Sequence, residues 1–77
     1  ENNNGNIYIP EVNIDVNSDA KVIIYDQLGR SMGDTYFQRL YSGNNTIELN
    51  FSDYSSGIYF LSFVIDNKNF VRQIIIE

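Results

Sequence analysis

The sequence predicts an all-β domain, a small Ig-like antiparallel β-sandwich of about seven strands. β-branched residues and aromatic rings, among them six Tyr and five Phe, dominate its apolar content, and these residues suit pleated, half-buried surfaces. Turn signals recur at intervals of roughly 8 to 12 residues, as in small sandwiches. No segment combines helical apolar spacing with capping residues, so no helix is expected.

The N-terminal part predicts a linker followed by two short strands. Residues 1–5 are rich in asparagine and end in glycine, which suggests a linker that leads into the first strand. Apolar residues alternate over 7–9 and again over 12–16. Pro10 lies between these runs and cannot donate to a strand ladder, so it should end the first strand or lie at an edge. A turn is expected at 17–19.

The next part predicts a hairpin. Residues 22–25 form a continuous apolar run, which favours a strand covered on both faces. Asp26 can accept hydrogen bonds from backbone amides two positions on, and Gly29 permits positive φ, so a turn should follow. The return strand should occupy 31–40, and Gly33 indicates a bulge or bend within or before it.

The second half predicts three further strands. A turn at 42–45 should lead into 47–51, where apolar and polar residues alternate as in a strand with one wet face. After a polar loop at 52–57, the apolar run 58–65 predicts a central strand. A four-residue connection should then lead into a strand at 70–76. Because these last two strands are the most apolar, we expect their hairpin to lie in the middle of a sheet.

Length and charge restrict the function. With 77 residues and no Cys, the chain should form a single domain over 1–77 that is held together by packing alone. Its net charge is −5 with only five basic residues, which argues against nucleic acid as a partner because phosphate binding needs clustered Lys and Arg. No apolar stretch is long enough for a membrane helix, and no signal-peptide pattern begins the chain.

Several residues admit a structural or a functional interpretation. Asp26 and Arg30 form either a recognition pair or, as we favour, a hydrogen-bonded turn with a weak ion pair. Gly29 and Gly57 should be structural. Tyr59 either bonds the backbone in the manner of a tyrosine corner or is a plain core ring.

Other side chains carry little functional signal. An aromatic sugar-stacking platform is conceivable, although such rings are usually core; it would use Tyr36, Phe37, Tyr41, Phe51 and Tyr54. Asp15, Asp19 and Asp53 do not have the spacing of a calcium loop, and two Asn-X-Ser/Thr sequons carry little weight. Without His or Cys no hydrolytic triad can form, so we expect no enzyme, cofactor or metal.

Four segments together resemble a known family. They are Asn3 to Ile7 (NNGNI), Val22 to Arg30 (VIIYDQLGR), Ser56 to Phe60 (SGIYF) and Phe70 to Glu77 (FVRQIIIE). Their order and spacing are similar to those of the type A C-terminal sorting domain of the type IX secretion system of Bacteroidota. The chain departs from that pattern in the loop before the second glycine motif, where Tyr54 stands for the usual leucine, and in its closing basic pair, reduced to Arg72 and Gln73.

The resemblance implies a folded export signal without catalysis. Such a domain follows a cargo domain and directs it from the periplasm to the outer-membrane translocon and its shuttle protein. A surface sortase then removes the domain and joins the cargo to lipopolysaccharide at the cell surface. The residues expected to carry the signal are Tyr25, Asp26, Gly29, Arg30, Gly57, Ile58, Tyr59, Arg72, Ile74, Ile75, Ile76 and Glu77. A carbohydrate-binding accessory module and an Ig-like spacer are the alternatives.

Overall fold

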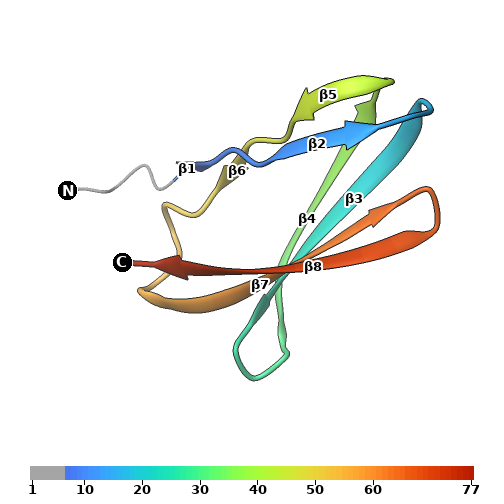
Figure 1. The fold of residues 1–77 in the computed structure, drawn as a ribbon. Helices are drawn as coiled ribbons and strands as arrows, with labels where there is room; N and C mark the ends of the chain where they lie inside the picture. Colours follow the sequence, from blue (N-terminus) through green and yellow to red (C-terminus); the bar gives the residue numbers. More distant parts are fainter. Residues whose placement is uncertain (1–6) are drawn as a thin grey trace.

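A computed structural model describes residues 7–77, in which every regular element is a β-strand (Figure 1). The expected linker at 1–5 lies outside the described residues, as does most of the first family-like segment. The strands are β1 (Ile7–Tyr8), β2 (Glu11–Ile14), β3 (Ser18–Asp26), β4 (Ser31–Leu40), β5 (Gly43–Thr46), β6 (Leu49–Asn50), β7 (Gly57–Ile65) and β8 (Lys68–Ile76).

The strands form one large sheet and two small strand pairs. The large sheet has four antiparallel strands in the order β4-β3-β7-β8, while β1 pairs with β6 and β2 pairs with β5. The two small pairs lie on one side of the twisted large sheet (Figure 1). The predicted all-β antiparallel sandwich is therefore confirmed, with eight strands where about seven were expected.

The core lies between the large sheet and the small pairs. Alternate residues of β3 and β7 point inward and are buried, including Val22, Ile24 and Leu61. From the other side, Ile47, Leu49 and Phe51 close the core, whereas Glu48 and Asn50 between them are exposed. The alternation predicted for 47–51 is thus confirmed, although only Leu49–Asn50 is a ladder strand.

The predicted hairpin and central strand are also confirmed. β7 lies between β3 and β8, as its apolar run suggested. Between the pairs Ile23↔Thr35 and Tyr25↔Ser31, β3 has one residue and β4 has three, so β4 bulges at Gly33. The strand at 22–25 is covered on one face only, because Ile23 and Tyr25 are half-buried on the open face of the sheet.

Two predicted turns are misplaced. The segment 42–45 is mostly strand β5, which pairs with β2. Its asparagines do not make the turn but support it, since Asn45 Oδ1 accepts from the Tyr41 amide at 3.0 Å. At the earlier site, β3 begins at Ser18, whose hydroxyl donates to the Val16 carbonyl at 2.9 Å, so the turn lies before the expected 17–19.

The position predicted for the last hairpin is half wrong. β7 is central, but β8 forms the edge of the large sheet, because β7 is its one ladder neighbour among the described residues. The apolar content of β8 suggested a strand between two neighbours. Among the described residues, the structure gives β8 only one such neighbour.

Candidate recognition surface

Three of the family-like segments meet at one end of the large sheet. Asp26 of β3 is paired with Tyr59 of β7, and Tyr59 is paired in turn with Ile74 of β8. Further toward this end, Ile58 is paired with Ile75 and Gly57 with Ile76. Residues about 50 positions apart in sequence therefore share one end of the sheet.

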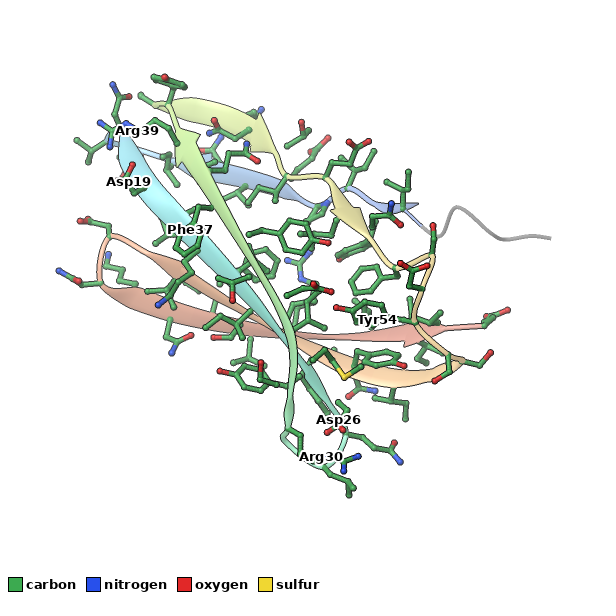
Figure 2. All side chains as sticks on the ribbon, turned by 180° about the vertical axis from the view of Figure 1, so that it is seen from behind. Asp19, Asp26, Arg30, Phe37, Arg39 and Tyr54 are labelled. Carbon is green, nitrogen blue, oxygen red and sulfur yellow. The ribbon has the colours of Figure 1, made fainter. Side chains whose placement is uncertain are left out.

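Asp26 organises the tip of the β3–β4 hairpin. Its Oδ1 accepts from the amides of Leu28 and Arg30, both at 2.9 Å, and its Oδ2 accepts from Arg30 Nε at 2.8 Å. Its backbone carbonyl accepts from the Gly29 amide at 3.0 Å. Figure 2 shows Asp26 and Arg30 together at this tip. The hydrogen-bonded turn with an ion pair, favoured from sequence, is the geometry observed.

The electrostatics of this turn favour a charged Asp26. The hydrogen bond from the Arg30 amide, with further bonds from the Arg30 side chain and the Leu28 amide, holds the pKa of the Asp26 carboxyl below its usual value despite some desolvation. Gly29 adopts a φ of +84°, which side chains disfavour. The Arg30 side chain is 73% exposed, so the ion pair contributes little stability while its guanidinium stays accessible.

A cluster of edge-to-face aromatic rings holds the loop before β7. The Tyr59 hydroxyl donates to the Ser55 carbonyl at 2.7 Å while its ring lies in the core, which is the backbone bond considered from sequence. Tyr54 packs edge-on between Phe51 and Tyr59, with ring centroids 5.2 and 5.3 Å away. Tyr54 thus links the buried Phe51 to Tyr59 at the start of β7.

Tyr54 of this aromatic cluster is held in place by a short hydrogen bond. The Tyr54 hydroxyl donates to Asp34 Oδ2 at 2.6 Å, which ties the loop to the bulge of β4. Desolvation, followed by this carboxylate, raises the pKa of Tyr54 well above its usual value. Sequence reasoning did not include Asp34, because no local pattern connects two residues 20 positions apart.

The last strand divides into buried and accessible residues. Ile74 and Ile76 point into the core, while Ile75 between them is 65% exposed on the open face. Arg72 lies further from this end, paired with Leu61, and its Nη1 donates to the Tyr8 hydroxyl at 3.2 Å. The structure therefore places most of the predicted signal residues at one end of the large sheet and Arg72 mid-strand, while the β3–β4 tip projects away from the end of β8 (Figure 1).

One accessible residue at this end was missed from sequence. Leu28 at the hairpin tip is 72% exposed. A leucine at the centre of a turn that otherwise holds polar residues and glycine is the signal that would have identified it. Leu28 and Arg30 thus give the hairpin tip an exposed apolar and an exposed basic side chain.

The alternative sites considered from sequence do not assemble. Phe51 is buried and Tyr36 and Tyr54 pack against the core, while Phe37 and Tyr41 are exposed, so the five aromatic residues form no platform. Among residues 7–77, no group of three or more His, Cys, Asp or Glu side chains has a metal-site arrangement. The same residues contain no helix long and apolar enough to cross a membrane.

Comparison with known proteins identifies the family. No curated protein and no solved structure matches the chain. The model of the secretion system C-terminal sorting domain matches residues 9–77, a range that includes the β3–β4 hairpin, the loop before β7 and the final strand. The chain therefore belongs to the family of type IX secretion C-terminal sorting domains.

Proposed function

We propose that this domain directs a preceding cargo domain through the type IX system to the cell surface and is recognised as one folded unit. The match of the sorting-domain family over residues 9–77 carries this proposal. On this proposal the outer-membrane translocon and its shuttle protein read the domain, and a surface sortase removes it afterwards. Residues 1–77 act as a single domain, with 1–5 as the connection to the cargo.

The arrangement of the family-like segments supports recognition of a folded surface. Asp26, Gly57 and Ile76 are far apart in sequence, yet each lies at one end of the same sheet. An unfolded tail would present them separately. Arg30, Leu28 and Ile75 are exposed side chains of this end, and we assign contact with the receptor to them. Gly29, Tyr59, Ile74 and Ile76 maintain the shape.

Export of a reporter tests the proposal. A signal-peptide-bearing reporter fused in front of the whole chain should reach the cell surface of a type IX-competent host and remain in the periplasm of a translocon-deficient strain. Deletion of Ile74 to Glu77 removes two buried side chains and should abolish export. Equal surface display with and without the translocon would contradict the proposal.

Sortase processing has its own readout. In the competent host the surface-displayed reporter should lack the mass of the domain, and inactivation of the sortase should leave the domain attached. A reporter that keeps the domain in both strains would contradict removal by a sortase without contradicting export.

A further inference from the structure

The edge strand β8 presents a row of backbone groups that no described residue pairs. β7 and β8 are joined by the two-residue turn Asp66–Asn67, both with positive φ, and Ile65 is paired with Lys68. In such a hairpin the closing pair exchanges both hydrogen bonds, and bonded and non-bonded pairs then alternate. The outward amides and carbonyls are therefore those of Asn69, Val71, Gln73 and Ile75.

Several apolar side chains of β8 are also exposed. Phe70 on the inner face is 53% exposed, and Val71 on the outer face is 68% exposed. Together with Ile75 they place exposed apolar side chains on both faces of one strand. A strand with an apolar sequence on both faces is typical of a sheet interior, yet β8 lies at the edge.

The other edges are less suited to pairing. On the opposite side of the sheet, β4 is interrupted by the bulge at Gly33, whose φ is +92°, and bulges protect edges from pairing. β2 has four residues and follows Pro10, which has no amide proton. β8 keeps an unbroken register with β7 over its nine residues, without Gly or Pro.

A groove beside β8 provides room for side chains of an added strand. The groove has a volume of about 530 Å³ and lies between β2 and the β7–β8 hairpin. Its wall residues include Val12, Ile14, Phe63, Ile65, Phe70 and Arg72.

The groove carries charges of both signs, those of Glu11, Asp15 and Asp66 together with those of Lys68 and Arg72, and Arg72 is the cation at the middle of β8. Arg30 and Arg39 have carboxylate partners, at 2.8 and 3.1 Å. Arg72 has no carboxylate within 4.0 Å among the described residues and donates to the Tyr8 hydroxyl. An occupant with an acidic side chain beside Arg72 and apolar side chains beside Phe70 would match this wall.

We propose that a strand of the receptor adds to the free edge of β8, hydrogen-bonds Asn69, Val71, Gln73 and Ile75, and places an acidic residue beside Arg72. This mode is β-augmentation, in which main-chain bonds provide affinity and flanking side chains provide specificity. The inference rests on the proposed function, because the strand belongs to the shuttle protein that reads the signal. A second copy is a poorer occupant, since the antiparallel register that pairs all of β8 with itself sets Arg72 opposite Arg72.

Residue-resolved amide exchange tests the inference directly. We would label the whole chain with ¹⁵N and measure amide exchange by NMR, free and bound to the purified shuttle protein. In the free domain the amides of Asn69, Val71 and Gln73 should exchange fast, and those of Phe70 and Arg72 slowly. Binding should slow exchange of the fast set by at least about tenfold and leave the slow set nearly unchanged. The added protection should therefore alternate from one residue to the next along β8.

A matched pair of variants separates backbone from side chain. Gln73→Pro removes an outward amide without touching the ladder with β7, and Gln73→Ala keeps that amide. We expect Gln73→Pro to weaken binding at least about fivefold and Gln73→Ala less than about twofold. Circular dichroism checks that both variants fold. If Gln73→Pro does not fold, the amide-exchange pattern of the unmodified chain alone tests the inference.

Each outcome has a distinct meaning. Binding without added protection along β8 overturns the inference and leaves the proposed function intact. No binding to the shuttle protein contradicts both. Protection of the same amides in the free domain, increasing with its concentration, shows that a second copy occupies the edge and overturns the assignment to the receptor. If Arg72→Glu binds the shuttle protein with unchanged affinity, the part of the proposal that places an acidic residue beside Arg72 is wrong.

Discussion

The bond between Tyr59 and Ser55 should make a measurable contribution to stability. Tyr59→Phe removes the hydroxyl that donates to the Ser55 carbonyl at 2.7 Å and leaves the buried ring in place. Loss of one partner of a partly buried hydrogen bond costs about 1–2 kcal/mol. For a domain of this size that corresponds to a fall in Tm of roughly 4–16 °C.

Urea denaturation followed by circular dichroism measures this loss, and Tyr36→Phe is the matched control. The Tyr36 hydroxyl bonds the backbone of Asn50 at 3.4 Å, a length at which hydrogen bonds are weak. Its removal should cost less than about 0.5 kcal/mol. Equal losses in the two variants would refute the assignment of a specific role to the Tyr59 bond.

Three further perturbations test the turn and the core. Gly29→Val should lower the free energy of unfolding by about 1–2 kcal/mol and Gly29→Asn by much less, because the φ of +84° is accessible to Asn. Equal falls in Tm for the two variants would contradict this. Asp26 has a lowered pKa in the folded state, so the stability that its charge contributes is present above the ordinary carboxyl pKa and is lost as the pH falls through the lowered value. The stability of Asp26→Asn should therefore fall less steeply with decreasing pH than that of the unmodified domain. Parallel curves of stability against pH would disprove this linkage. Leu61→Ala should cost about 2–5 kcal/mol because the side chain is fully buried, whereas the exposed Ile75→Ala should cost less than about 1 kcal/mol; comparable losses in urea titrations would contradict the assigned faces.

Local features were the ones that sequence predicted well. The turn at Asp26 depends on bonds to Leu28 and Arg30 within the same few residues, so its residue types suffice to predict it. The alternation over 47–51 likewise records a single buried face. The bulge at Gly33 followed from the conformational freedom of glycine.

Features set by distant partners could not be predicted. The segment at 42–45 reads as a turn, but pairing with β2 makes most of it a strand, supported by the bond from Asn13 Nδ2 to Asn44 Oδ1 at 2.7 Å. The apolar sequence of β8 does not reveal that the fold leaves this strand with one ladder neighbour among the described residues. The contact of Tyr54 with Asp34 joins residues that only the fold brings together.

Export of a folding-defective domain tests most directly the claim that the signal is a folded surface. Leu61→Asp would bury a charge at a fully buried position and should unfold the domain, whereas Phe37→Ser changes a residue that is 76% exposed and distant from the β3–β4 tip (Figure 2). In a type IX-competent host, the account predicts surface display of the reporter with Phe37→Ser and its retention in the periplasm with Leu61→Asp. Display at the wild-type level from a Leu61→Asp domain that circular dichroism shows to be unfolded would contradict it.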